Sequence, residues 1–311
     1  MIKYVYICSA GHSGSTLLDL LLGSHSRSVS LGEIAQLPKN IALNSRCSCG
    51  SPLSHCKVWQ AIISILNQKL KKNISRNPYA LNLGFIYAKV VLDKKHSTPL
   101  YQVKKKILAG LDYYRLRYGI LFVKKILFYL DEVNRHSFLL YNVIRETLAK
   151  QIIIDSSKTY LRAVNLYRAD PASTRLILLT RDGRGVLYSN LKKKFPAETS
   201  VRQWKNYYSR TIRLLNQYVV GKHCIRVRYE DLASDPEGAL KLICDFLNIK
   251  YESRMLAFAS THHHILGGND LRFSKSSEIR PDFKWKVGLS RDDLYRFERI
   301  AGKLNNELGY H

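Results

Sequence analysis

The sequence feature that most constrains the fold is a glycine- and serine-rich turn near the N-terminus. It has the sequence SAGHSGST, follows an apolar run at Lys3–Ser9 and leads into an apolar segment at Thr16–Leu22. Glycines let the backbone turn tightly, so that successive N–H groups can converge on an oxyanion at the start of a helix. The alternative is a purely structural turn. We interpret the glycine- and serine-rich turn as a phosphate-binding loop formed by Gly11, His12, Ser13, Gly14, Ser15 and Thr16.

Further apolar runs predict an α/β fold with a central parallel sheet flanked by helices. Buried strands are expected at Lys3–Ser9, Gln151–Asp155, Arg175–Thr180 and Cys224–Tyr229, and helical periodicity follows most of them. Residues 61–150 have a helical pattern and predict an insertion between the first two of these strands. We expect residues 1–311 to form a single domain, since no repeat or low-complexity linker divides them.

The net charge is strongly positive. The chain has 50 Lys and Arg against 24 Asp and Glu, a formal charge of +26. Nucleic acid, an anionic membrane surface or an anionic substrate would each suit such a charge. The lysine runs are scattered along the chain, however, which also fits a solvated basic surface. The N-terminus does not resemble a secretory signal and no long apolar segment is present, so we expect a cytoplasmic protein without a transmembrane segment.

A second phosphate site is predicted after the strand at Arg175–Thr180. Arg181 leaves the end of that strand, and Ser189 lies eight residues further on, about two helical turns away. A guanidinium and a hydroxyl so placed can share one phosphate monoester, although Arg181 could instead pair with a carboxylate. The first loop lacks the lysine of the G-x-x-x-x-G-K-[ST] pattern, which disfavours a common ATP or GTP site. Two separate phosphate sites favour a nucleotide phosphorylated at two places.

These residues resemble a known family. The segments GHSGST and RDGRGVLYS, followed by Tyr229-Glu230-Asp231-Leu232, are similar to the sulfotransferases that use 3′-phosphoadenosine 5′-phosphosulfate (PAPS). The closer likeness is to bacterial members, which share LGE, CSCG, DSSK and a late G-N…R-F…W pattern. The resemblance implies a P-loop-like fold and in-line transfer of a sulfuryl group, without an obligatory metal ion.

The resemblance also implies roles for the two phosphate sites. The first loop would hold the 5′-phosphosulfate, Arg181 and Ser189 the 3′-phosphate, and Tyr229 would lie near the adenine. In the tail, Arg272 and Lys275 match the family's C-terminal phosphate-contacting loop. Residues 262–311 would thus form a segment that caps the donor nucleotide and ends in a helix near Arg291–Leu308.

Glu33 is the expected general base. It follows an extended Val29–Leu31 and occupies the place of the catalytic glutamate in protein-tyrosine and some carbohydrate sulfotransferases; it could instead be a helix-start glutamate.

His12 departs from the family, since most relatives carry Lys or Arg there to stabilise the leaving phosphate. Either His12 takes this role as an imidazolium, or Lys158, at the end of DSSK, supplies the charge.

Two clusters of soft side chains raise the question of a metal site. Cys47 and Cys49 with the adjacent His55 and Cys56 offer four ligands, but this spacing strains a tetrahedral site. We therefore favour reduced structural cysteines or a local disulfide over zinc, and no metal ligand is predicted. The run His262–His264 is expected to lie in a loop with diverging side chains.

The sequence thus predicts a PAPS-dependent sulfotransferase. Its partners would be the nucleotide sulfate donor and an acceptor hydroxyl on a glycan, a lipid or a small metabolite, with anionic glycans and lipids included. The alternatives are a basic nucleic-acid-binding protein and a nucleotide kinase of related fold. No nucleic-acid-binding motif is present, and the missing lysine disfavours the kinase. Neither the acceptor nor the oligomeric state can be predicted from the sequence.

Overall fold

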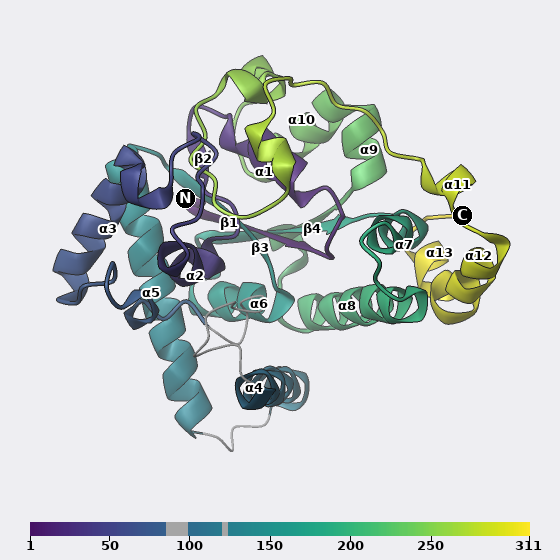
Figure 1. Cartoon of the computed structure of the whole chain (residues 1–311), viewed down its shortest axis with the longest axis horizontal. Coiled ribbons are helices and arrows are strands. Elements are labelled where there is room, and N and C mark those ends of the chain that lie inside the picture. The colour runs from purple at the N-terminus through teal and green to yellow at the C-terminus, as the bar shows by residue number, and fades with distance from the viewer. Residues whose placement is uncertain (85–98, 120–123) are drawn as a thin grey trace.

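The computed structural model describes residues 1–84, 99–119 and 124–311, and a five-stranded parallel sheet lies at its centre (Figure 1). The strand order is β2-β3-β1-β4-β5. This confirms the predicted central parallel sheet, with β2 as a short additional edge strand. The strands are β1 (Tyr4–Ser9), β2 (Ser28–Ser30), β3 (Ile152–Lys158), β4 (Thr174–Thr180) and β5 (Cys224–Arg228).

Both faces of the sheet are covered, as the continuous apolar runs predict. Side chains alternate along β1: Tyr4, Tyr6 and Cys8 belong to one hydrophobic cluster, and Val5 and Ile7 to the other. The helices divide accordingly in Figure 1, where one group lies above the sheet and the other below it. The first group is α1 (Ser15–Gly23), α9 (Tyr229–Ser234) and α10 (Pro236–Phe246); the second includes α5 (Lys124–Thr147), α6 (Tyr160–Ala169) and α8 (Ala197–Tyr218).

The remaining helices surround this core at its edges (Figure 1). On one side α3 packs against α5, and on the other α12 packs against α7 and α8. The predicted last helix is present, but it contains a π-helical turn at Glu298–Gly302. The bounds are α2 (Leu37–Ala42), α3 (Lys57–Leu70), α4 (Pro99–Tyr118), α7 (Gly183–Leu191), α11 (Trp285–Gly288), α12 (Arg291–Phe297) and α13 (Lys303–Glu307).

In its described residues, 61–84, 99–119 and 124–150, the predicted insertion forms helices and no strand. It consists of most of α3, together with α4 and α5, which lie on the lower face and edge of the sheet in Figure 1. Residues 85–98 and 120–123 of this predicted insertion lie outside the described part of the chain.

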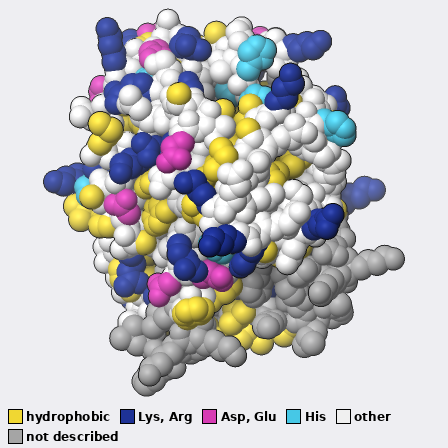
Figure 2. Space-filling view, turned by 90° about the vertical axis from the view of Figure 1, so that its left-hand side faces the viewer, with side chains coloured by type: hydrophobic (Ala, Val, Ile, Leu, Met, Phe, Trp, Pro, Cys, Tyr) yellow, Lys and Arg dark blue, Asp and Glu magenta, His cyan; other side chains and the backbone are white. Residues whose placement is uncertain are grey.

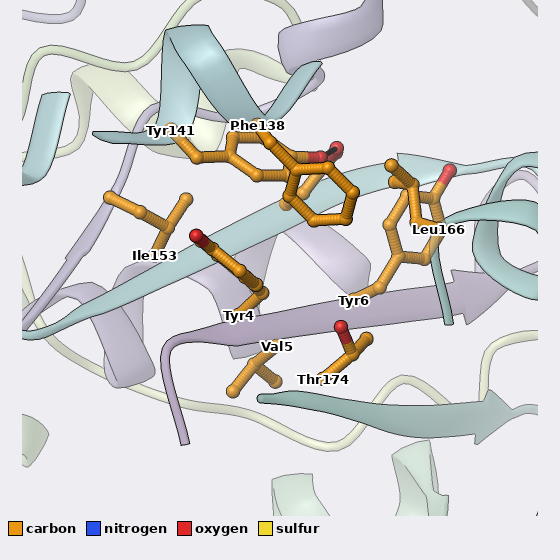
Figure 3. Close-up of a pocket in the computed structure, with 9 residues that line it drawn as sticks. Tyr4, Val5, Tyr6, Phe138, Tyr141, Ile153, Leu166 and Thr174 are labelled. Carbon is orange, nitrogen blue, oxygen red and sulfur yellow. Dashed lines mark hydrogen bonds between the residues drawn. The ribbon is translucent and has the colours of Figure 1, made fainter. Parts of the chain in front are cut away.

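An aromatic cluster fixes α5 to the sheet (Figure 3). Tyr4 stacks at a tilt on Tyr141 and on Phe138, with ring centroids 5.4 and 5.2 Å apart. The Tyr141 hydroxyl donates to Asp155 Oδ2 over 2.5 Å, and the same carboxylate lies 3.5 Å from Arg162 Nε. This buried pair keeps β3 in place just before the strand reaches its functional end.

The basic side chains are spread over the surface. On the face shown in Figure 2, Lys and Arg are scattered over the described part, with acidic side chains among them, rather than gathered in one patch. A scattered distribution fits the solvated basic surface considered from the sequence. Within residues 1–84, 99–119 and 124–311, we find no helix with the length and apolar character needed to cross a membrane.

Candidate active site

The glycine-rich turn joins the end of β1 to the start of α1, as predicted. His12 and Gly14 both adopt positive φ angles, of 62° and 84°. A Cβ atom on Gly14 would lie 2.4 Å from Cδ2 of Tyr229, so only glycine allows this ring to pack on the loop. All nine residues of α1 are buried, which places the N-terminus of a core helix beneath the turn. Such a helix start favours an anion.

Tyr208 of α8 supports the loop from below, which the sequence did not suggest. Its hydroxyl lies 3.1 Å from Ser13 Oγ, accepts from the Ala10 N–H over 3.4 Å and donates to the Leu179 carbonyl over 2.9 Å. Burial raises the pKa of Tyr208 to about 12, so the hydroxyl keeps its proton at neutral pH. The Ser13 side chain is fully buried and serves this support. Ser13 therefore contributes its backbone to the loop rather than a hydroxyl.

Arg181 extends from the end of β4 toward the same loop. Its Nη1 donates to the His12 carbonyl over 2.8 Å, and its guanidinium lies 4.4 Å from the centre of the Tyr229 ring. Its Nη2 pairs with Asp282 Oδ2 at 3.0 Å. The structure thus brings together three residues that the sequence analysis singled out, and adds a carboxylate to them. Ser189 lies on α7, where its hydroxyl donates to the Gly185 carbonyl over 2.9 Å.

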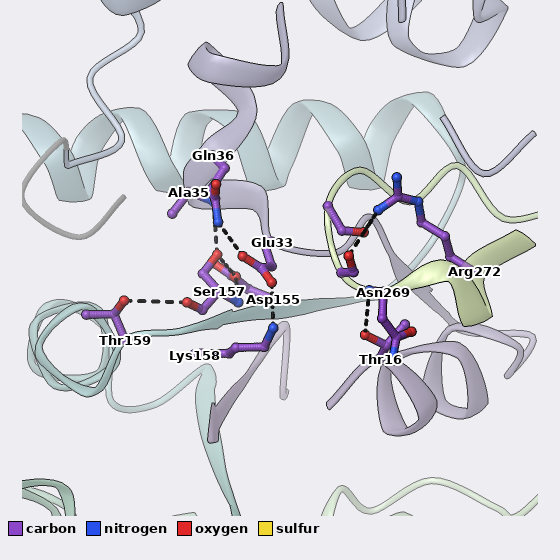
Figure 4. A network of polar contacts seen from close by, with 12 residues as sticks. Thr16, Glu33, Ala35, Gln36, Asp155, Ser157, Lys158, Thr159, Asn269 and Arg272 are labelled. Carbon is purple, nitrogen blue, oxygen red and sulfur yellow. Dashed lines mark hydrogen bonds and ion pairs between the residues drawn. The ribbon is translucent and has the colours of Figure 1, made fainter. Parts of the chain in front are cut away.

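Glu33 lies beside the ends of β2 and β3, with 3% of its surface exposed. Lys158 Nζ is 2.5 Å from Glu33 Oε1, and the amide of Gln36 donates to Glu33 Oε2 (Figure 4). The Glu33 N–H donates to the Leu266 carbonyl over 3.2 Å, so a segment of the tail holds the backbone of Glu33. Two candidate catalytic residues, 125 positions apart in the sequence, therefore form one ion pair.

The rest of the DSSK segment fixes this pair. The register between β1 and β3 shifts near the end of β3, and Lys158 takes a positive φ of 71°. Asp155 Oδ1 accepts from the Ser157 N–H over 2.8 Å, while Ser157 Oγ accepts from the Ala35 N–H over 2.9 Å (Figure 4). These bonds hold the loop after Glu33 against the end of β3, and they direct Lys158 toward the carboxylate.

The tail residues Arg272 and Lys275 lie elsewhere. Arg272 donates to the Gly267 carbonyl near the Glu33 loop, and Lys275 is exposed. The structure does not bring either into contact with Arg181, whose partner from the tail is Asp282. Their assignment to the 3′-phosphate stays a prediction from the resemblance. Near them, the Asn269 N–H donates to Thr16 Oγ1 over 3.3 Å and ties the tail to α1 (Figure 4).

The cysteine-rich loop differs from the sequence interpretation in one respect. His55, which we grouped with the cysteines, is exposed and contacts Ser54 Oγ at 3.0 Å. His264 takes its place, with Nδ1 3.2 Å from Cys56 Sγ. The cysteine spacing and the histidine run were both visible in the sequence, but only the tertiary fold joins them.

Comparison with known proteins finds a family that part of the chain resembles. Residues 124–253 match the model of the sulfotransferase family. Over this stretch, the chain is similar to members of the sulfotransferase family. A Caenorhabditis briggsae protein named "Putative protein-tyrosine sulfotransferase" is 30% identical over 182 residues, which cover 52% of this chain and 61% of that protein. Protein-tyrosine sulfotransferase A of Caenorhabditis elegans is 26% identical over 155 residues, covering 44% and 39%. The chain thus matches less than two thirds of the length of either relative.

Solved structures support the fold. The sulfotransferase domain from the curacin biosynthetic pathway superposes with a TM-score of 0.53 at 19% identity, covering 100% of this chain and 99% of that one. The sulfotransferase domain of the Synechococcus PCC 7002 olefin synthase gives 0.52 at 17% identity, covering 97% and 94%. These likenesses confirm the predicted P-loop-like fold.

Proposed function

We propose that this protein is a sulfotransferase that moves a sulfuryl group from PAPS to an acceptor hydroxyl. The observation that carries the proposal is the convergence of three features at the carboxyl ends of neighbouring parallel strands. These are the turn after β1, Arg181 after β4 and the Glu33–Lys158 pair at the end of β3. Ligands of open parallel sheets bind at this edge.

The chemistry of the residues present fits a doubly phosphorylated nucleotide. The backbone N–H groups of Gly11–Thr16 at the start of α1 would hold the 5′-phosphosulfate. Arg181 and Ser189 would bind the 3′-phosphate, and Tyr229 would lie by the adenine. Asp282 already places an anionic group against Arg181, which supports an anion site there. Its carboxylate would have to leave before a phosphate could take that position.

In the proposed reaction, Glu33 takes the proton of the acceptor hydroxyl. The hydroxyl oxygen then forms a bond to sulfur while the bond between sulfur and the bridging phosphate oxygen breaks. The leaving group is 3′-phosphoadenosine 5′-phosphate. Lys158 pairs with Glu33 through their 2.5 Å contact and so positions the carboxylate. Lys158 or His12 would stabilise the charge on the leaving phosphate, and the reaction needs no metal ion.

The acceptor class is also part of the proposal. The curated relatives are named for protein tyrosine, which makes a phenolic hydroxyl the first acceptor to test. Glycan, lipid and small-metabolite hydroxyls, including anionic ones, are the further classes expected from the sequence. A cytoplasmic site of action stays a prediction.

Calorimetric titration with 3′-phosphoadenosine 5′-phosphate, beside AMP, ATP and a short DNA duplex, tests the donor. We expect tight binding of the bisphosphate alone. Arg181→Ala should weaken it at least thirtyfold, about 2 kcal/mol, because a charge-assisted pair is lost. Arg202→Ala, at an exposed site on α8, is the matched control and should bind like the wild type.

Two results would contradict the donor assignment. Unchanged affinity in Arg181→Ala would remove the 3′-phosphate from this residue. Preference for ATP would favour a kinase, and DNA binding that weakens steeply with salt would favour a nucleic-acid-binding protein.

A further inference from the structure

The structure brings together four side chains that ligate soft metals, from two distant parts of the chain. Cys47, Cys49 and Cys56 come from the loop before α3, and His264 comes from the tail. Their ligand atoms all lie within 4.8 Å of one another. None of the four belongs to the proposed sulfuryl-transfer site.

The distances among three of these atoms suit a tetrahedral ion. Cys47 Sγ and Cys56 Sγ are 3.9 Å apart, and His264 Nδ1 lies 3.8 Å from the first and 3.2 Å from the second. Around a zinc ion with Zn–S of about 2.3 Å and Zn–N of about 2.0 Å, a tetrahedron has S–S edges of about 3.8 Å and S–N edges of about 3.5 Å. The observed spacings agree with these values to within a few tenths of an ångström.

A disulfide accounts for the cluster less well. All six cysteines are free thiols in the structure, and a sulfur–sulfur bond of about 2.05 Å is far shorter than the 3.9 Å between Cys47 and Cys56. A bridge between any two of the three cysteines would also leave the third and His264 without a role. One metal ion uses all four ligands.

The surrounding hydrogen bonds hold the two segments in register. Ser48 stands between them: its N–H donates to the Ile265 carbonyl over 3.1 Å, and its hydroxyl donates to the His263 carbonyl over 2.6 Å. Trp59 Nε1 donates to the His264 carbonyl over 3.0 Å. The backbone of His264 is therefore held in place beside the cysteine loop.

We propose that Cys47, Cys49, Cys56 and His264 bind one structural zinc ion. Three thiolates and an imidazole are soft ligands that favour zinc over magnesium or calcium. Four protein ligands leave no open position, which is typical of a structural rather than a catalytic zinc site. Binding would release the thiol protons and leave a net charge of −1 on the site. This revises the preference drawn from the sequence, where His55 was the fourth ligand considered.

The site lies next to the backbone contact that holds Glu33. Two residues after His264, Leu266 accepts from the Glu33 N–H and donates to the Leu31 carbonyl over 3.1 Å. A metal ion at His264 would therefore fix the tail segment on which the Glu33 loop rests. Losing it should loosen both the cysteine loop and this part of the tail.

Metal analysis of the full-length protein, purified without chelators, tests the proposal independently of sulfuryl transfer. Elemental analysis should give one zinc per chain, and a mercurial reagent should release it. Cys49→Ser and His264→Ala should lower the zinc content at least tenfold and lower Tm, whereas His264→Cys should retain zinc because it restores a fourth ligand. The matched controls are His55→Ala and Cys224→Ser, which should both keep the full content.

The cobalt-substituted protein adds a readout of geometry. It should show thiolate-to-cobalt charge transfer and the intense visible bands of a tetrahedral site. A folded wild-type protein that contains no metal and binds no added zinc would overturn the proposal, as would zinc lost in His55→Ala but kept in His264→Ala. Thiol counting after unfolding in EDTA without reductant should give all six cysteines of the chain. Two fewer would indicate the disulfide.

Discussion

At the scale of single residues, the most informative contact is the ion pair between Glu33 and Lys158. Glu33 is almost fully buried, and each of its carboxylate oxygens has a partner: Lys158 on one and Gln36 on the other. A buried carboxylate is stable only when it is paired and hydrogen-bonded, and this one is both. An acceptor hydroxyl must replace or share one of these partners before it can give up its proton.

Replacing Glu33 by glutamine tests the role of the general base. The amide keeps the shape but cannot take a proton, so Glu33→Gln should lower kcat about a hundredfold or more. Binding of 3′-phosphoadenosine 5′-phosphate should be no weaker than in the wild type. Steady-state kinetics and calorimetry measure the two effects separately. Glu198→Gln, at an exposed site on α8, is the control, and near-normal turnover of Glu33→Gln would move the base role to another group.

At the scale of elements, α1 carries a buried acidic side chain among leucines. Asp19 is 1% exposed, accepts a hydrogen bond from the Ser30 hydroxyl, and has its pKa raised to about 7, chiefly by burial. The native state therefore holds a proton on Asp19 between about pH 4 and pH 7, where the unfolded chain does not. Stability from this group is present below pH 4 and is lost as the pH rises toward 7.

The substitution Asp19→Asn should remove that pH dependence. The wild-type free energy of unfolding should fall by up to about 4 kcal/mol more than that of the variant between pH 4 and pH 7, since three pKa units are involved. Urea unfolding at a series of pH values measures the difference. Asp292→Asn, at an exposed site on α12, should follow the wild-type curve. Parallel curves for the wild type and Asp19→Asn would mean that Asp19 is ionised in the native state throughout this range.

At the scale of the whole molecule, the C-terminal helices support the strand-end site from the side. Phe297 is fully buried, and a Cβ on Gly183, the first residue of α7, would lie 2.5 Å from its ring. Asn305 Oδ1 accepts from the Gly183 N–H over 3.0 Å, and the Tyr310 hydroxyl lies 2.8 Å from Thr180 Oγ1. The last residues of the chain therefore pack against the β4–α7 junction that carries Arg181.

Truncating Phe297 should consequently affect both stability and donor binding. Phe297→Ala should lower the free energy of unfolding by about 3–5 kcal/mol, because it leaves a cavity in the core. Loosening of α7 should also weaken binding of 3′-phosphoadenosine 5′-phosphate in the folded variant. Denaturant unfolding and calorimetry check the two effects. Tyr295→Ala is the control, since Tyr295 is 70% exposed on the same helix, and an equal loss in both variants would contradict the packing argument.

The sequence by itself determined the parts of this protein that depend on local pattern. Each predicted strand is present to within a few residues. Three of them, β1, β3 and β4, are apolar runs that are almost entirely buried between the two layers of helices. The fourth, β5, lies at the edge of the sheet, and only Val227 of this strand is buried. The loop before α1 and the position of Arg181 could be predicted in the same way, because each lies between the end of a strand and the start of a helix. Parallel strands end at one edge of the sheet, which is why these residues lie near one another in the structure.

Only the tertiary structure decided which side chains meet. Tyr208 supports Ser13 across 195 positions, Asp282 reaches Arg181 across 101, and His264 joins Cys47 across 217. No periodicity or motif encodes such a partner, since the contact depends on how helices and loops pack after the chain has folded. The same reason explains why His264, and not His55, lies beside the cysteines. The side chains of adjacent residues point apart in an irregular loop. His264 of the tail, in contrast, places its Nδ1 3.2 Å from Cys56 Sγ.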